Sequence, residues 1–413
     1  ITTEMPHPDL VGTGGIAVNL TNENILPLIG TGYTFDSETG TYALTGYTSV
    51  DPTTLDYNGN TKYYYCAASF NTSTNDLITT SRSYSNCTVM YQVINATKAE
   101  GTSTGLGGAS IKTMRYQITA YTYTQSEQES DKSDRGLYAM EDDHGTSYYY
   151  RGSVTNNYVQ FAGYYWRVVR INGDGSVRLL YAGTTPNATG SDLQIKASTF
   201  NNQRDNPGYV GYMYGNTFNT SYEQTHANEN DSTIKNELDN WYKTNIVDKN
   251  LSSYIADSGF CNDRSLDSGN GVSTTADTYF GGYGRYVNHE PNLICPQQND
   301  LFTVENEDGN QVLTYPIGLI TVDELMLGGL SNGYLNRLSY TYSSAHYWAM
   351  TPRHFNATYT SAYELYTNSS GHVLYNYVTY ATGGIRPVIN LASTVEIESG
   401  IGTANDPFVV KIA

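Results

Sequence analysis

The cysteines are the residues whose spacing most clearly predicts chemistry. The chain holds four, Cys66, Cys87, Cys261 and Cys295, which fall into two local pairs. Neither pair forms a Cys-x-x-Cys motif or has a histidine at zinc-ligand spacing. A disulfide within each pair would close a loop of a few tens of residues and stabilise the fold by about 3 kcal/mol. We therefore expect the disulfides Cys66–Cys87 and Cys261–Cys295, and with them an oxidising, exported location.

A run of acidic side chains, Glu141-Asp142-Asp143, stands next to His144. Carboxylates placed in this way can bind a cation, or act as an acid/base pair in glycan hydrolysis. The whole chain is acidic, however, with a net charge of −18. We therefore favour a solvated turn for this run.

Motifs for nucleophilic catalysis or phosphate binding do not occur in the sequence. It contains no Gly-x-Ser-x-Gly, no Gly-x-Gly-x-x-Gly after a predicted strand and no Gly-Lys-Ser/Thr loop. The seven histidines lie in unrelated contexts. His346 and His354 stand beside aromatic residues, and we expect structural roles for both. We predict a protein without catalytic residues, metal ligands or a cofactor.

Composition narrows the class of partner. The negative net charge and a pI near 4.6 argue against nucleic acid, because a phosphate backbone requires clustered Lys and Arg. No stretch reaches the roughly 18–20 apolar residues of a membrane span. The chain begins at Ile1, and we interpret it as a mature or trimmed form.

Tyrosine is the most unusual component, with 40 residues in the chain. Clusters at 63–65, 148–150, 164–166 and 375–380 could stack on sugar rings or pack across an interface, although pairing on exposed strands explains many of them. Possible glycosylation sites are also frequent. Asn-x-Ser/Thr sequons begin at Asn19, Asn71, Asn86, Asn95, Asn187, Asn219, Asn230, Asn250, Asn356 and Asn368.

The pattern along the chain predicts two domains and an arm. Residues 1–32 hold two apolar patches and could form an arm or strand, either exchanged between subunits or docked in its own domain. Residues 33–130 read as a β-rich domain, with alternating strands at 88–94 and 114–123. A polar, charged stretch at 125–135 marks the boundary before an α+β domain at 134–413.

Within the second domain the sequence predicts strands, one well-defined hairpin and two helices. The hairpin joins 165–171 to 177–181 through Asn172-Gly173-Asp174-Gly175, a turn rich in residues that accept positive φ. This turn also resembles half of a calcium loop, but the closing ligands are missing. The helices are expected at 232–247, capped by Ser232, and after the capping box at 321–324. Further strands are expected at 148–151, 159–161, 346–351, 362–366, 373–380, 385–391 and 406–412.

A resemblance accompanies these elements. The segment 136–179, which contains Trp166-Arg167-Val168-Val169-Arg170-Ile171, resembles an uncharacterised family of large secreted proteins of Gram-positive bacteria. Later landmarks occur in the same order, at 241–242, 260–263, 293–296, 314–321, 347–352, 384–391 and 400–410. The likeness covers 134–413 and implies a pilin or pilus-associated role. The type IV prepilin-like N-terminal helix of many members is absent from this sequence.

The landmarks at 347–352 and 384–388 also resemble the C-type lectin-like fold shared with formylglycine-generating enzymes. The catalytic and copper-binding cysteines of those enzymes have no counterpart, so their activity is not implied. Taken together, we predict an α+β protein, with an N-terminal β-rich domain followed by a C-type lectin-like domain with two helices and antiparallel strands.

The expected function is that of an extracellular structural or adhesive protein, a homopolymeric subunit of a pilus-like surface filament. Its partners would be copies of itself, with carbohydrate or a host surface as further contacts. A monomeric carbohydrate-binding adhesin is the alternative, and a secreted glycan hydrolase that uses residues such as Glu141–Asp143 is a second one.

Overall fold

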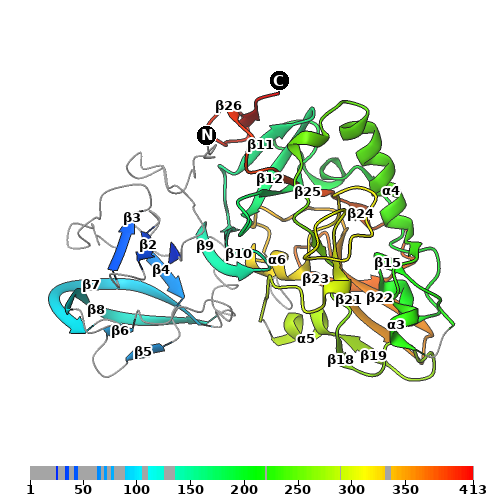
Figure 1. Ribbon diagram of the computed structural model, residues 1–413, viewed down its shortest axis with the longest axis horizontal. Coiled ribbons are helices and arrows are strands. Elements are labelled where there is room, and N and C mark those ends of the chain that lie inside the picture. The colour runs from blue at the N-terminus through cyan, green and yellow to red at the C-terminus, as the bar shows by residue number, and fades with distance from the viewer. Residues whose placement is uncertain are drawn as a thin grey trace.

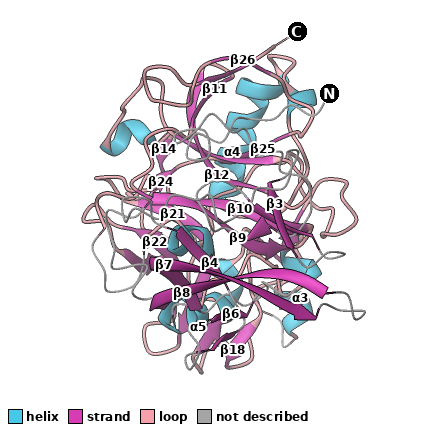
Figure 2. Ribbon diagram, turned by 90° about the vertical axis from the view of Figure 1, so that its left-hand side faces the viewer, coloured by secondary structure: helices cyan, strands magenta, loops and turns pink. Residues whose placement is uncertain are grey.

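The computed structural model describes residues 140–412 with their side chains, except 219–220, 289 and 331–335, together with the backbone of the strands between residues 25 and 139. These residues form a mixed α+β structure in which strands predominate, as predicted (Figures 1 and 2). None of the helices in this part of the chain has the length and apolar character needed to cross a bilayer.

The strands before residue 135 pair in antiparallel fashion. They are β1 Ile25–Leu26, β2 Tyr33–Asp36, β3 Thr41–Leu44, β4 Tyr63–Cys66, β5 Ser69–Asn71, β6 Asp76–Ile78, β7 Val89–Thr104 and β8 Ser110–Thr124. The long pair β7–β8 contains both alternating runs expected in this region and extends beyond them. Most of the 1–32 arm lies outside the described residues, and the domain boundaries stay predictions.

A first sheet of the second region has the strand order β25-β13-β12-β11-β27-β26, and β10 pairs with both β12 and β9. Its strands are β9 Arg135–Asp142, β10 Gly145–Gly152, β11 Tyr158–Phe161, β12 Tyr164–Ile171, β13 Val177–Tyr181, β25 Val388–Leu391, β26 Ile397–Ser399 and β27 Phe408–Val410. The final strand pairs parallel to β11 and buries Phe408 and Val410. Ile412, expected on the same buried face, lies beyond the strand and is exposed.

The predicted hairpin β12–β13 is present, but its turn uses less positive φ than expected. Among its four residues Gly175 alone has positive φ, +82°. Gly173 is required for space instead, because a Cβ at this position would lie 2.6 Å from Oδ1 of Asp142. The turn is therefore shaped by its contact with the β9–β10 hairpin.

A second sheet is centred on β21. Its strands are β14 Lys196–Ala197, β18 Leu266–Ser268, β19 Thr278–Phe280, β21 Tyr347–Asn356, β22 Ser361–Thr367, β23 Val373–Tyr377 and β24 Gly384–Ile385. On one side of β21 lies β22, which in turn pairs with β23. On the other side, β24 pairs with the beginning of β21 and β19 pairs with its end. Two small ladders, β15 Met213–Tyr214 with β16 Asn230–Asp231 and β17 Phe260–Cys261 with β20 Leu301–Phe302, complete the strands.

The strand predicted at 385–391 is divided between the two sheets. β24 belongs to the second sheet and β25 to the first, and the chain crosses between them at Arg386-Pro387. Proline cannot donate a ladder hydrogen bond, which favours a break at this point. The buried Arg386 guanidinium donates to the backbone oxygens of Tyr181 and Thr341 and so holds the crossing in place.

Four α-helices occur in the described residues, two more than predicted. They are α3 Tyr222–Thr225, α4 Thr233–Tyr242, α5 Gly281–Asn288 and α6 Val322–Leu327; the short helices are η2 Gly190–Leu193, η3 Pro207–Val210, η5 Ser252–Tyr254 and η6 Gln298–Asp300, and the π-helical turn η4 Lys243–Val247 continues α4. Ser232 caps α4, and the capping box of Thr321 and Glu324 opens α6, so both predicted helix starts are confirmed.

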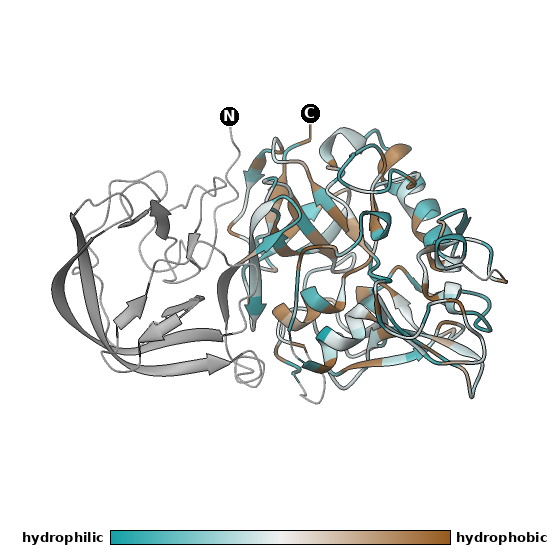
Figure 3. Ribbon diagram, turned by 60° about the horizontal axis from the view of Figure 1, so that its bottom comes forward, coloured by the Kyte–Doolittle hydropathy of each residue, from teal (hydrophilic) through white to brown (hydrophobic). Residues whose placement is uncertain are grey.

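Helix α5 was missed because its sequence begins with glycines, which disfavour helix. A Cβ on Gly282 would lie 2.2 Å from Cγ2 of Thr351 in β21, so glycine permits the close packing of α5 on the second sheet. The two sheets and their helices share one core, which includes the fully buried Trp166 and Trp348. Figure 3 shows hydrophobic stretches along the strands and helices and hydrophilic stretches along many connecting loops.

Candidate functional site

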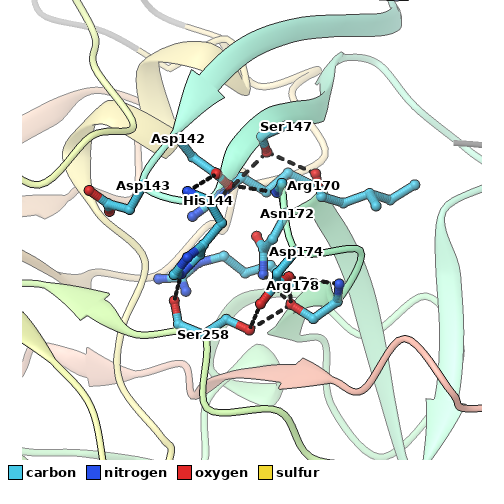
Figure 4. Close-up of polar contacts among 12 residues, drawn as sticks. Asp142, Asp143, His144, Ser147, Arg170, Asn172, Asp174, Arg178 and Ser258 are labelled. Carbon is cyan, nitrogen blue, oxygen red and sulfur yellow. Dashed lines mark hydrogen bonds and ion pairs between the residues drawn. The ribbon is translucent and has the colours of Figure 1, made fainter. Parts of the chain in front are cut away.

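The acidic run Glu141–Asp143 lies at the β9–β10 hairpin, where Asp142 is paired with Gly145. Asp142 is buried and accepts hydrogen bonds from the backbone amides of His144 and Gly173. Its Oδ2 also lies 2.5 Å from Nη1 of Arg170. The expected solvated turn is therefore wrong for Asp142, because a cation on β12 holds this carboxylate inside the fold (Figure 4).

Asp142 belongs to a charged network of Asp142, Arg170, Arg178 and Glu324. Glu324 Oε1 lies 3.0 Å from Nε of Arg170 and 2.5 Å from Nε of Arg178. All four side chains are buried. Burial alone would raise the pKa of Glu324, but the two guanidiniums outweigh it and hold that pKa below its usual range. Two carboxylates thus balance two guanidiniums, and the network joins β9, β12 and β13 to α6.

A second group of charges lies nearby. Arg285 of α5 binds Asp323 through two hydrogen bonds of 2.7 and 3.0 Å, and its Nη1 lies 2.7 Å from Oδ2 of Asp263. This group lines a cavity of about 30 Å³ together with three members of the charged network, Arg170, Arg178 and Glu324. That space matches one or two water molecules, whereas small-molecule sites usually measure about 300–1,000 Å³. The ion pairs of Arg285 with Asp263 and Asp323 stabilise the packing of α5 against α6.

The side chains closest to a Ser/His/Asp arrangement surround the β12–β13 turn (Figure 4). Asp174 accepts hydrogen bonds from the hydroxyls of Ser176 and Ser258. Nε2 of His144 faces the backbone oxygen of Ser258, at 3.4 Å, rather than its hydroxyl. A catalytic base must bond the hydroxyl that it activates. These hydrogen bonds therefore stabilise the β12–β13 turn. They agree with the prediction that this segment is a hairpin turn and not a calcium loop.

One of the two predicted disulfides lies in the described part of the chain and is confirmed. Cys261 and Cys295 form a disulfide, with their Cα atoms 5.6 Å apart. The predicted Cys66–Cys87 bond lies outside the described side chains. Across the described part of the chain, no three His, Cys, Asp or Glu side chains converge as metal ligands.

A row of aromatic rings, here called the aromatic ladder, crosses the second sheet. It consists of Tyr279 on β19, His354 on β21, Tyr363 on β22 and Tyr377 on β23, and each ring stands directly opposite the next in the strand register. The ring centroids of successive members lie 5.2, 4.3 and 4.7 Å apart. Side chains on one face of neighbouring strands pair in this way. The four rings therefore form a continuous aromatic strip across four strands.

Further aromatic and cationic groups surround this strip. Tyr375 is 43% exposed and packs edge-on against His354 and Tyr363. The Arg353 guanidinium lies 3.6 Å from the ring centre of Tyr375 and 4.7 Å from that of Tyr283, and Arg204 lies 4.4 Å from Tyr377. Cation–π contact accounts for these arrangements. Within this cluster His354 and Tyr363 are buried, so its accessible rings are those of Tyr375 and of the half-buried Tyr279 and Tyr377.

Three histidines are packed in aromatic surroundings. His346 stacks on Tyr366, and His354 belongs to the aromatic ladder, so both have the structural settings expected from sequence. His226, which the sequence did not distinguish, is fully buried against Tyr222. Burial, helped by a neighbouring arginine, lowers the pKa of His226 and of His354 to about 3. Both therefore remain neutral at pH 7.

Glu364 of β22 is buried, and neither carboxylate oxygen has a hydrogen-bond partner among the described residues. It alternates with Tyr363 and so faces the core rather than the aromatic ladder. Burial raises the pKa of Glu364 well above its usual value. The folded protein thus retains a proton that the unfolded chain releases above about pH 4.5, and the stability contributed by this proton declines as the pH rises.

Glu364→Met is expected to increase the free energy of unfolding at pH 8 by about 1–3 kcal/mol, because it removes an unsatisfied buried group without emptying the site. The gain in the free energy of unfolding should shrink toward pH 4.5, because Glu364 destabilises the folded protein less at that pH. Urea unfolding at the two pH values measures it. Glu307→Met, at an exposed position, is the control and should change stability by less than about 0.5 kcal/mol. A loss of stability for Glu364→Met at pH 8 would contradict the assignment.

The sequons differ in their surroundings. Asn187, Asn230 and Asn250 are exposed, while Asn356 and Asn368 are half-buried and accept hydrogen bonds from nearby loop amides. The side chains of Asn19, Asn71, Asn86, Asn95 and Asn219 lie outside the described residues. Glycosylation of these positions stays a prediction.

Comparison with known proteins returns no relative. No family model matches the chain, no curated protein matches it, and no solved structure matches it. The resemblance to secreted Gram-positive proteins and to the C-type lectin-like fold therefore stays a hypothesis, and the function must be argued from the site.

Proposed function

We propose that this chain is an extracellular structural or adhesive protein that works through surface contact, and that the accessible part of the aromatic ladder, together with the neighbouring Tyr375, is the contact surface. Tyr375 and its neighbours offer flat apolar rings with polar tips, a combination that gives large contact area with few rotatable bonds. Sugar rings carry one apolar face of C–H groups and many hydroxyls, so stacking on such rings with hydrogen bonds at the edges suits carbohydrate. The aromatic ladder is the observation that carries this proposal.

The Cys261–Cys295 disulfide supports the exported location, because disulfides persist in oxidising compartments. The lectin-like assignment of the second domain and the separate N-terminal β-rich domain belong to the same proposal. A secreted glycan hydrolase receives less support, since Glu141, Asp142 and Asp143 each accept hydrogen bonds from their own neighbours, Thr146, Arg170 and the Cys295 amide.

Two forms of the proposal differ in assembly. The chain is either a homopolymeric subunit of a pilus-like filament at the cell surface, as the sequence favours, or a single adhesin that binds carbohydrate or a host surface. In a filament the aromatic ladder would recur along the polymer, so that weak contacts add through multivalency. Electron microscopy of the native material distinguishes the two forms, because filaments are visible without knowledge of the ligand.

Tyr375→Ala is expected to weaken binding of an oligosaccharide ligand at least about tenfold, because contact surfaces draw most of their affinity from a few central aromatic residues. A panel of neutral and acidic oligosaccharides, titrated against the full chain by calorimetry, measures the effect. Tyr359→Ala provides the matched control, since Tyr359 is 67% exposed but, unlike Tyr375, makes no described ring contact with the aromatic ladder. Equal losses for the two variants, or no binding by the parent chain to any member of the panel, would reject carbohydrate as the ligand.

A further inference from the structure

A second cavity, separate from the aromatic ladder, has a volume of about 180 Å³. It lies between β12, the segment 182–193 that follows β13, the crossing from β24 to β25, and the segment 338–342. Arg167 and Arg386 line it, together with Tyr158 and Tyr340. Exposed Leu338 also lines the cavity and marks the side that opens to solvent.

The two arginines are buried without a carboxylate. Arg167 donates to Oδ1 of Asn157 and to the backbone oxygen of Val154, and Arg386 donates to the backbone oxygens of Tyr181 and Thr341. Neither forms an ion pair with any carboxylate of the described residues, whereas Arg170, Arg178, Arg264 and Arg285 all do. Among the described residues, no acidic side chain lines the cavity, although the chain carries 40 Asp and Glu residues.

Two guanidiniums in this position carry an electrostatic cost that an anion would offset. Burial lowers the pKa of both Arg167 and Arg386, and the positive charge of Arg386 lowers the pKa of Arg167 further. Guanidinium forks match carboxylate, sulfate and phosphate oxygens, and hydrogen bonds between ions are stronger than those between neutral groups. Because one water molecule needs about 10–15 Å³ of such space, the cavity has room for an acetate, sulfate or phosphate ion.

We propose that this cavity binds a small oxyanion, a carboxylate, sulfate or phosphate group, between Arg167 and Arg386. The two guanidiniums supply the charge, while the rings of Tyr158 and Tyr340, 4.0 and 5.4 Å from Cζ of Arg167, hold that guanidinium in place. This site is independent of the aromatic ladder and does not require that the protein bind carbohydrate.

Thermal unfolding of the full chain tests the proposal, with sodium acetate, sulfate and phosphate as probes and sodium chloride at matched ionic strength as reference. At a probe concentration ten times its Kd, the Tm should have risen by roughly 2–5 °C, and above the Kd it should increase only with the logarithm of the probe concentration. Acetate against sulfate and phosphate distinguishes a planar carboxylate from a tetrahedral oxyanion as the preferred ligand.

Leu338→Trp should abolish the rise by filling the mouth of the cavity from an exposed position, and Leu338→Ala should retain it. Arg167→Met should also abolish the rise; if that variant does not fold, the Leu338 pair decides. Sulfate and phosphate also stabilise proteins generally, through exclusion from the protein surface, and this part of the rise should be equal in the parent chain and in Leu338→Trp. A rise that is equal in the parent chain and in Leu338→Trp, or no rise beyond chloride with any probe, would overturn the proposal.

Discussion

Replacing Glu324 with glutamine is expected to lower the free energy of unfolding by about 3–5 kcal/mol, because Arg170 and Arg178 would then share the Asp142 carboxylate alone inside the core. Glutamine can still serve the capping box of α6, so the substitution removes the charge and keeps the helix start. Chemical unfolding at pH 7 measures the loss.

Glu237→Gln is the matched control. Glu237 pairs with Lys196 at the surface, where both side chains are substantially exposed, and its loss should cost less than about 1 kcal/mol. If Glu324→Gln were as mild as this control, the charged network would not hold the first sheet to α6.

Stability is also expected to fall as the pH drops below about 6.5, by up to about 1.4 kcal/mol per pH unit for each of His226 and His354. The folded-state pKa of each is depressed to about 3. Between pH 6.5 and pH 3 the unfolded chain therefore binds protons that the folded protein refuses, and the free energy of unfolding decreases with pH. Arg264 beside His226 and Arg353 beside His354 act in the same direction.

Urea unfolding between pH 7 and pH 5 measures this slope before most carboxylates begin to titrate; Glu364, whose pKa is raised by burial, contributes in the opposite direction to the parent chain and to each variant alike. His354→Phe retains a ring between Tyr279 and Tyr363 and should reduce the slope by about 1.4 kcal/mol per pH unit. His372→Phe, at a half-buried position outside the aromatic ladder, serves as control. An unchanged slope in His354→Phe would contradict a neutral, buried His354.

Local patterns in the sequence predicted local structure well. The strand at 177–181 has the predicted bounds, Ser232 caps α4, and Thr321 with Glu324 forms the predicted capping box. Each of these depends on residues within a few positions of one another. Helix α5 escaped prediction because its glycines serve packing on Thr351 of β21, a contact made far along the chain.

The site was harder to predict for the same reason. Glu324 stands 154 positions from Arg170, so its type and spacing could not reveal the pair. The aromatic ladder joins positions 279, 354, 363 and 377. The alternation of residues along one strand predicts the face on which a side chain lies, but it does not predict which residue of the neighbouring strand lies beside it. A signal was nevertheless present, since His354 was noted for its aromatic setting and the tyrosines at 375–380 as a cluster.

The most direct test of function is to incubate the full chain with an oligosaccharide mixture, recover the bound fraction and determine its chemical structure by mass spectrometry. We predict that sugars are retained, recovered intact and lost from the bound fraction of Tyr375→Ala. Shortened sugars that accumulate with the parent chain, and fail to accumulate once Glu141, Asp142 and Asp143 are neutralised, would contradict a role in contact and assign the protein to catalysis.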